Sequence, residues 1–162
     1  MADPVEFRPG QIDQGDGRAL ATAMLAEISE IYGGVDLDAP GLPKAGPSEL
    51  SPPGGTFLVG YLDGAPVCCG GIKDLHADGA CEFKRMYVVP EQRGRGVARQ
   101  LLSAMEAEAR RMGYRLARLD TGDRQPAAQH VYLSSGFQPI HNFNDNPVAS
   151  WFGEKPLAPA PD

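Results

Sequence analysis

Apolar residues recur at every third or fourth position in two long segments of the chain, which predicts two amphipathic helices. The first is expected from an N-cap at Asp16 to Tyr32, and the second over residues 96–112. Glycines follow both segments and indicate where each helix ends. The apolar stripes consist of Leu20, Met24, Ile28 and Ile31 in the first helix and Val97, Leu101, Met105, Ala109 and Met112 in the second.

Shorter runs rich in valine, phenylalanine, tyrosine and isoleucine predict strands. These runs lie at residues 5–8, 56–62, 66–73, 81–89, 115–120, 138–140 and 149–155. Asp63-Gly64 is a strong hairpin signal, and the helix at residues 96–112 is a crossover that implies parallel pairing of the strands beside it. Pro126 suits the first turn of a third helix through Ser134. This order predicts an α/β fold with a mixed sheet, in which an antiparallel meander precedes a parallel βαβ crossover.

The chain is predicted to form a single domain over residues 1–155, followed by a loose C-terminal tail at residues 156–162. Residues 33–55 are rich in glycine and proline and show little periodicity. A connection this long inside a compact domain is usually functional or mobile. Together with the polar loop at residues 141–147, it is expected to form the walls of a substrate site.

Composition and charge exclude several classes of protein. The 162 residues carry a net charge of −6, which argues against binding to nucleic acid, and 42% of them are apolar, as in ordinary globular domains. No apolar run reaches the length of a membrane span, and the N-terminus lacks the features of a signal peptide. The three cysteines are expected to be reduced core residues of a cytoplasmic protein. No metal is expected, because no histidine has a partner at ligand spacing.

A glycine loop opens directly into the second long helix. Gly94 and Gly96 allow the backbone to approach a ligand closely, and the free N–H groups at a helix N-terminus attract anions. Arg93, Arg95 and Arg99 add positive charge. The loop lacks the Gly-Lys-Ser/Thr ending of a nucleoside triphosphate loop and the spacing of a dinucleotide site. Taken alone, it indicates either an anion site or an ordinary glycine-rich turn.

The segment around this loop resembles the GCN5-related N-acetyltransferases (GNAT superfamily). Arg93-x-x-Gly96-x-Ala98 matches the family signature [Arg/Gln]-x-x-Gly-x-[Gly/Ala]. The run from Glu82 to Val88 resembles the fourth strand of that family, and the likeness extends over roughly residues 56–157. Further matches are Leu119-Asp-Thr-Gly122 with the fifth strand and Tyr132 to Gly136-Phe137 with the helix and turn that follow it.

The resemblance implies that acetyl-CoA is the co-substrate and that its acetyl group passes to a primary amine by direct attack in a ternary complex. In this family the fourth and fifth strands separate at a bulge, and the cofactor fills the gap. Backbone groups of Met86, Tyr87 and Val88 would then face the thioester and the pantetheine arm, with an N–H near Val88 stabilising the oxyanion. The pyrophosphate would lie on backbone N–H groups of Arg93, Gly94, Arg95, Gly96, Val97 and Ala98.

Two further residues are candidates for the chemistry. An alkyl amine has a pKa near ~10 and must lose a proton before it attacks. Glu82 is the candidate base, directly or through a water, and alternation along the strand would place it on one face with Lys84 and Met86. The alternative is a structural glutamate paired with Lys84. By the resemblance, Tyr132 protonates the leaving sulfur; the alternative is an aromatic residue that only packs its helix on the sheet.

A second class of function remains open from the sequence. The same fold can serve as a non-catalytic sensor that holds CoA, or as an interaction module. The intact glycine loop favours CoA binding, and the presence of Glu82 and Tyr132 favours catalysis. The expected partners are therefore acetyl-CoA and an amine, with neither nucleic acid nor a membrane. A homodimer is compatible with the fold, although no residue predicts one.

Overall fold

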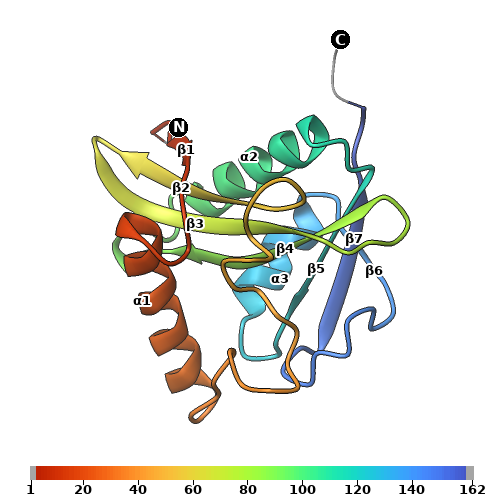
Figure 1. Cartoon of the computed structure of the whole chain (residues 1–162). Helices are drawn as coiled ribbons and strands as arrows, with labels where there is room; N and C mark the ends of the chain where they lie inside the picture. The colour runs from red at the N-terminus through yellow and green to blue at the C-terminus, as the bar shows by residue number, and fades with distance from the viewer. Residues whose placement is uncertain (1–2, 160–162) are drawn as a thin grey trace.

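The structure, a computed structural model, describes residues 3–159 as one seven-stranded mixed sheet with helices on both faces (Figure 1). The strands are β1 (Glu6–Pro9), β2 (Thr56–Leu62), β3 (Ala65–Asp74), β4 (Ala80–Val88), β5 (Leu116–Thr121), β6 (Gln138–Pro139) and β7 (Trp151–Pro156). Their order in the sheet is β1-β2-β3-β4-β5-β7-β6. Only β4 and β5 pair in parallel, and the other neighbours are antiparallel. The predicted meander and crossover are confirmed.

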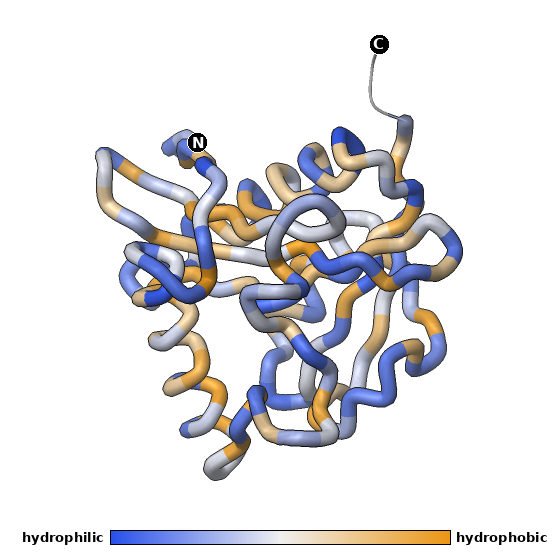
Figure 2. Tube along the Cα trace, viewed as in Figure 1, coloured by the Kyte–Doolittle hydropathy of each residue, from blue (hydrophilic) through white to orange (hydrophobic). Residues whose placement is uncertain are grey.

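The helices separate into two layers. The α-helices are α1 (Gly15–Ile31), α2 (Val97–Arg111) and α3 (Pro126–Ser134), and one 3₁₀ turn, η1, spans Pro90–Gln92. Two apolar clusters lie on opposite faces of the sheet, one with residues of α2 and α3 and the other with Leu20 of α1. Cys68 belongs to the first cluster and Cys69 to the second, as strand alternation requires. Figure 2 shows apolar colour along the central strands and polar colour in the loop at residues 141–147.

Two details of the predicted elements are wrong. Asp16 does not cap α1, because the helix begins at Gly15 and its N-cap is Gln14, two residues before Asp16, with no side-chain cap. The Asp16 carboxylate instead accepts a hydrogen bond from the hydroxyl of Tyr61, at 2.8 Å. The tail does not begin at Pro156, because this residue pairs with β5 and the buried Leu157 donates its N–H to the carbonyl of Arg115. Residues 160–162 of the predicted tail lie outside the described residues.

The sheet opens between its two parallel strands. β4 pairs with β5 only from Ala80 to Glu82, although β4 continues to Val88. On the other side, the register between β3 and β4 shifts between Cys69 and Gly71, and Arg85 has a φ of 57°. A bulge of this kind bends a strand and increases its twist. The bulge therefore accompanies the separation of β4 from β5, which the family resemblance implied.

The packing of α2 against the sheet supplies a direct test of the core. Leu101 is 1% exposed within the cluster beneath α2, whereas Leu133 of α3 is 43% exposed. Leu101→Ala should lower the free energy of unfolding by about 2–5 kcal/mol, because it removes buried methyl groups and leaves a cavity. The control Leu133→Ala should change it by less than about 0.5 kcal/mol. Urea unfolding of both variants measures the difference, and equal values would contradict this packing.

Candidate functional site

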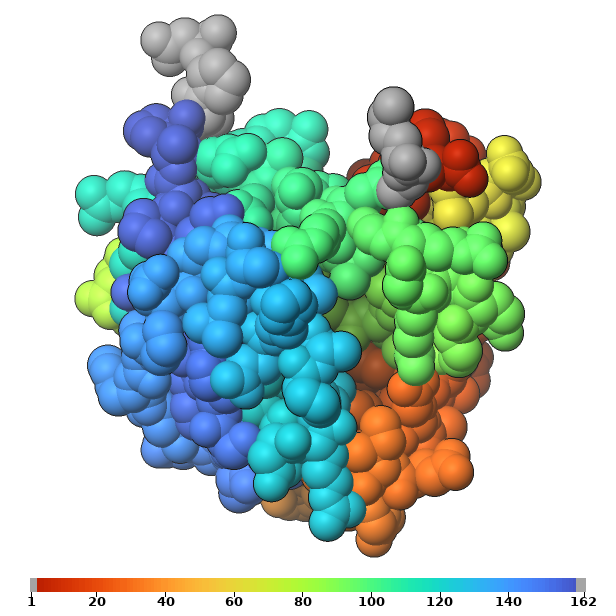
Figure 3. Space-filling view, turned by 180° about the vertical axis from the view of Figure 1, so that it is seen from behind, coloured from red at the N-terminus to blue at the C-terminus, as the bar shows by residue number. Residues whose placement is uncertain are grey.

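A cleft of about 910 Å³ occupies the gap between β4 and β5. Its walls come from α1, from residues 33–55, from the loop leading into α2 and the start of that helix, and from most of α3. Figure 3 shows the hollow from behind, where the orange α1, the green loop and the light blue α3 meet. The cleft is therefore built by segments from the whole length of the chain.

The bulge decides which side chains of β4 face which layer. Glu82 and Lys84 share one face and form an ion pair at 3.2 Å. Met86 packs instead in the cluster under α2 and α3, together with Phe83. The predicted common face for Glu82, Lys84 and Met86 is therefore wrong for Met86, because the extra residue at Arg85 shifts the alternation by one.

The edge of β4 that faces the cleft carries unpaired backbone. Met86, Tyr87 and Val88 all line the cleft, beyond the last residues that pair with β5 in the described sheet. On their other side, Tyr87 and Val88 pair with β3. An edge strand presents free N–H and C=O groups, and here those groups are held beside a cavity. This edge can bind an extended ligand through the main chain.

The glycine loop lies at one end of the cleft. Gly94 and Gly96 have φ values of 77° and 83°, in the left-handed region that glycine adopts without strain. Gly96 is the N-cap of α2, and its carbonyl accepts the first helical bond from Gln100. Val97 and Ala98 precede that bond and line the cleft, so their free N–H groups at the helix N-terminus could hold an anion.

The arginines of this loop differ in their positions. Arg93 lines the cleft, donates to the carbonyl of Val88 at 3.0 Å and pairs with Glu27 of α1 at 2.7 Å. Arg99, on the first turn of α2, also lines the cleft. Arg95 is exposed and is not part of the lining formed by the described residues. All of the other residues that the resemblance assigned to the cofactor line the cleft.

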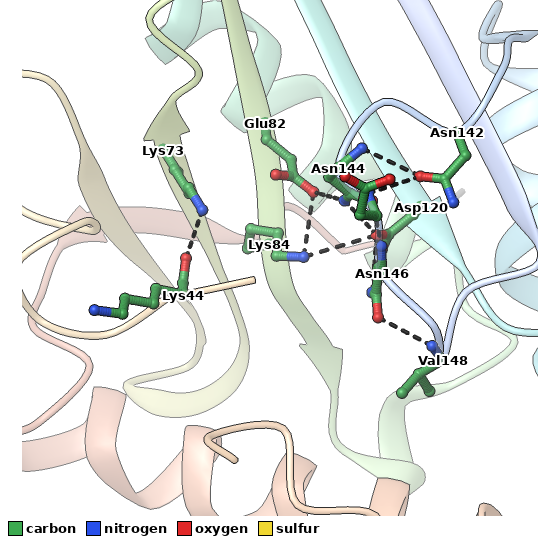
Figure 4. A network of polar contacts seen from close by, with 10 residues as sticks. Lys44, Lys73, Glu82, Lys84, Asp120, Asn142, Asn144, Asn146 and Val148 are labelled. Carbon is green, nitrogen blue, oxygen red and sulfur yellow. Dashed lines mark hydrogen bonds and ion pairs between the residues drawn. The ribbon is translucent and has the colours of Figure 1, made fainter. Parts of the chain in front are cut away.

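Glu82 belongs to a polar cluster formed by β4, β5 and the loop at residues 141–147 (Figure 4). One amide nitrogen, Nδ2 of Asn144, donates to Oε2 of Glu82 at 2.8 Å and to Oδ2 of Asp120 at 2.7 Å. The ammonium of Lys84 lies 3.2 Å from the first carboxylate and 3.8 Å from the second. Asn146 also donates to Asp120, at 3.0 Å. The two carboxylates are thereby held together by an amide and an ammonium group.

Glu82 itself lies behind the cleft. Its side chain is fully buried. Among the described residues, Lys84 and Asp120 line the cleft and Glu82 does not, although Glu82 was the residue expected there. Burial raises the pKa of Glu82; the ammonium of Lys84 opposes the shift and the charge of Asp120 adds to it. Within residues 3–159, Oε1 of Glu82 has no hydrogen-bond partner. Glu82 is thus a carboxylate of raised proton affinity with a free lone pair.

The sequence pattern offered Lys84 as a partner of Glu82, but it did not identify Asp120 or Asn144. In the sequence, Asp120 belongs to the match with the fifth strand of the family, and Asn144 is one member of the polar loop at residues 141–147. They lie 38 and 62 positions from Glu82, so no local spacing connects the three residues. The only signal was the polar character of the loop at residues 141–147. The described structure brings this loop and the C-terminal end of β5 to the same point.

Tyr132 lines the cleft from α3 on the side of Met86. Its hydroxyl donates to Sδ of Met86 at 3.7 Å, and its ring stacks on Trp151 with a centroid distance of 6.2 Å. Burial strongly raises the pKa of the phenol, with a smaller contribution from Asp120, so the hydroxyl keeps its proton at neutral pH. A thioether is a weak acceptor, and a stronger acceptor in the cleft can compete for this hydroxyl.

The described residues contain no cluster of three or more side chains that could hold a metal ion. Burial raises the pKa of the thiols of Cys68 and Cys81 to about 12. These thiols remain protonated at neutral pH and are poor nucleophiles. Within residues 3–159, no helix is long and apolar enough to cross a bilayer.

Comparison with known proteins identifies the family. The sequence profile of the acetyltransferase (GNAT) domain matches residues 53–139, which is more than half of the chain. The chain belongs to the GNAT acetyltransferases. The family resemblance read from the glycine loop is thereby confirmed, and the chain is an enzyme of acetyl transfer.

Individual relatives agree with this assignment. An IAA acetyltransferase of Azospirillum brasilense is 38% identical over 111 residues, covering 67% of this chain and 72% of the relative. An aminoalkylphosphonate N-acetyltransferase of Salmonella typhimurium is 35% identical over 66 residues, which cover 41% and 43% of the two chains. Several other relatives are spanned less completely; an N-acetyltransferase of Schizosaccharomyces pombe matches over 62% of its length.

Solved structures share the fold across nearly the whole chain. A protein of Klebsiella pneumoniae assigned as an acyl-CoA N-acyltransferase has a TM-score of 0.75 at 30% identity, covering 95% of this chain and 98% of its own. A PaiA N-acetyltransferase of Thermoplasma acidophilum, solved in complex with coenzyme A, has a TM-score of 0.67 at 16% identity, covering 95% and 99%. The second likeness shows the fold alone.

Proposed function

We propose that this GNAT enzyme transfers the acetyl group of acetyl-CoA to a small primary amine by direct attack in a ternary complex. One observation carries the proposal. A single cleft joins a helix N-terminus suited to a pyrophosphate with a pair of carboxylates suited to accepting a proton, Asp120 in the lining and the buried Glu82 behind it. The named substrates of the relatives, IAA and aminoalkylphosphonates, support a small-molecule acceptor.

The donor would lie along the free edge of β4. Its pyrophosphate would accept hydrogen bonds from backbone N–H groups between Arg93 and Ala98, and Arg99 would add charge from the first turn of α2. Arg95 would make at most a peripheral contact, since its side chain is exposed. The pantetheine arm would then run past Met86, and an N–H near Val88 would polarise the thioester carbonyl.

The acceptor amine would lose its proton to the carboxylate pair. Asp120 stands at the cleft surface and Glu82 directly behind it, and Asn144 joins the two. Because Glu82 is fully buried, we propose that it receives the proton through Asp120 or a water rather than by direct contact. Its raised pKa makes it a better proton acceptor than an exposed glutamate, and the nearby Lys84 still favours the ionised form before reaction.

The leaving thiolate would accept a hydrogen bond from Tyr132. The pKa of this phenol is raised above its usual value near ~10, whereas a thiol has a pKa near ~8.5. Complete proton transfer from Tyr132 to the thiolate is therefore uphill. We propose that Tyr132 stabilises the developing negative charge as a hydrogen-bond donor, in the way that donors of an oxyanion hole do.

Direct transfer is favoured over a covalent enzyme intermediate. Cys81 is the cysteine nearest to the candidate base in sequence, but it is fully buried and its pKa is raised to about 12. A nucleophilic cysteine instead needs an exposed position and a lowered pKa. We therefore place the amine, and no residue of the chain, as the group that attacks the thioester.

Acetyl-CoA and CoA should each raise the melting temperature, and acetyl-CoA with a panel of primary amines should release free thiol. At a ligand concentration 100 times Kd, the expected stabilisation is about 2.7 kcal/mol. ATP, which carries phosphates without the pantetheine arm, is the control and should shift the melting temperature less. Absence of a shift with both CoA species would overturn the donor assignment. If the melting temperature rises but no amine causes release of free thiol from acetyl-CoA, the result would favour the CoA-binding sensor instead.

Two finer predictions accompany this function. We propose a cytoplasmic location, which rests on three free cysteines that are all buried. We also keep the homodimer as a proposal from the fold alone. Size-exclusion chromatography with light scattering measures the second directly.

A further inference from the structure

Arg85 is a buried cation with unused hydrogen-bond donors. Its side chain is 6% exposed, and its only ion pair within residues 3–159 joins Nη2 to Oδ1 of Asp38, at 3.0 Å. Neither Nε nor Nη1 has a hydrogen-bond partner in the described part of the chain. Arg85 is also the residue at the bulge of β4, with a φ of 57°. The backbone therefore adopts a strained conformation at the position that holds this guanidinium.

A buried guanidinium with unpaired donors costs free energy unless another group accepts its hydrogen bonds. Burial lowers the pKa of Arg85, against the raising effect of Asp38 and Asp36, yet a guanidinium remains charged throughout the physiological range. A buried charge is stable only when it is paired and its donors are satisfied. Asp38 is an incomplete partner, because its own side chain is 63% exposed and it engages one nitrogen. The two free donors thus call for an anionic acceptor.

The position of Arg85 suggests where that acceptor comes from. Arg85 lines the main cleft and also a smaller adjoining pocket of about 170 Å³, formed with α1 and with residues 38 and 45–47. It follows Lys84, whose ammonium contacts both carboxylates of the polar cluster. Arg85 thus lines the same cleft as Lys84 and Asp120, where the amine is proposed to bind.

We propose that Arg85 binds an anionic group on the acceptor, so that the substrates of this enzyme are small amines that also carry a carboxylate or a phosphonate. This inference rests on the proposed acetyl transfer and specifies its acceptor class. Arg85 would donate charge-assisted hydrogen bonds to the anion from Nε or Nη1, whose N–H groups point from different edges of the planar guanidinium. The amine would then lie beside Asp120 and Lys84, where its proton is removed.

Matched pairs of acceptors test the proposal. Amino acids are compared with the alkylamines that lack only the carboxylate, and 2-aminoethylphosphonate is compared with ethylamine. Since a hydrogen bond to a charged group contributes about 1.5–3 kcal/mol, kcat/KM should be about 10- to 100-fold higher for the anionic member of a pair. Comparing the phosphonate pair with the carboxylate pairs identifies which anion the subsite prefers. Equal kcat/KM within every pair would overturn the proposal and leave acetyl transfer intact.

Variants of Arg85 and its partner give the decisive comparison. Arg85→Gln should lower the ratio of kcat/KM for the anionic amine to that for its plain partner by about 10- to 100-fold, mainly through a raised KM for the anionic amine, while KM for acetyl-CoA stays the same. Arg85→Lys should restore part of the preference, because it keeps the charge without the planar set of donors. Asp38→Asn should lower KM for anionic amines, because it removes the carboxylate that competes for the guanidinium. Arg111→Gln, an exposed arginine paired with Glu108, is the control.

The outcomes separate this inference from the proposed function. An equal loss with anionic and plain amines in Arg85→Gln, or a raised KM for acetyl-CoA, would mean that Arg85 has only a structural role. If no amine is acetylated, the melting temperature of the CoA-bound protein can still be measured with each member of a pair of amines. A larger shift with the anionic member, lost in Arg85→Gln, supports the subsite even then. No difference between the members would overturn it.

Discussion

Glu82→Gln should lower kcat by about 10²- to 10⁴-fold, the usual contribution of a general base. Glutamine keeps the size of the side chain and can still accept from Asn144, but it cannot take up a proton. The bound ammonium would then have no proton acceptor behind Asp120. KM for acetyl-CoA should stay the same, because Glu82 is separated from the glycine loop by the length of β4.

The pH dependence of Glu82→Gln gives a sharper signature than its rate. Burial raises the pKa of Glu82, so the carboxylate is protonated at a higher pH than an exposed glutamate would be. Wild-type activity should therefore be full above that raised pKa and fall as the pH is lowered through it. In the variant the break in the profile at the pKa of Glu82 should disappear. In its place, kcat/KM should rise about tenfold per pH unit over the whole range below the amine pKa near ~10.

Glu106→Gln is the matched control for the Glu82 experiment. Glu106 is also a buried, ion-paired glutamate, held by Lys155 at 2.6 Å, but it belongs to α2 and not to the cleft formed by the described residues. This control should retain the wild-type pH profile. A wild-type profile in Glu82→Gln as well would exclude Glu82 as the proton acceptor and leave it as a structural partner of Lys84.

Tyr132→Phe should lower kcat by about 10²- to 10³-fold, comparable to the loss of one oxyanion-hole donor. The expected loss has the same size from pH 6 to pH 9, because the raised pKa keeps the phenol protonated over this whole range. The melting temperature should hardly change, since phenylalanine keeps the stacking on Trp151 and loses only a weak hydrogen bond to Met86. Kd for CoA should also be retained.

Pre-steady-state measurement of thiol release tests this step, and Tyr114→Phe provides its control. Tyr114 is a partly buried tyrosine whose hydroxyl donates to the carbonyl of Gly54, outside the cleft lining of the described residues. Its loss should leave the chemical step unchanged. Equal rates in Tyr132→Phe and the wild type would return Tyr132 to a packing role, and a loss that grows with pH would mean that its proton is transferred completely.

For the loops that form the walls of the cleft, the sequence predicted their position at the site but not their individual contacts. Residues 33–55 and 141–147 were predicted to border a substrate site from their length and polarity, and both segments contribute to the lining, through Leu37, Leu42 and Asn146 among others. Their composition did not predict the individual contacts. Asp38 pairs with Arg85 and Asn144 bridges two carboxylates because the fold places these loops, which have no periodicity of their own, against β4.

The sequence by itself determined the order of the elements, the meander and crossover, the glycine loop at the start of α2 and, through these, the family. Such features depend on local spacing, since periodicity, turn residues and helix starts act within a few neighbouring positions. The tertiary structure alone decided the opposite faces of Met86 and Glu82, the burial of Glu82 behind Asp120, and the unpaired donors of Arg85. Each of these follows from the register of β3 on β4 and from contacts between distant segments, which local spacing does not determine.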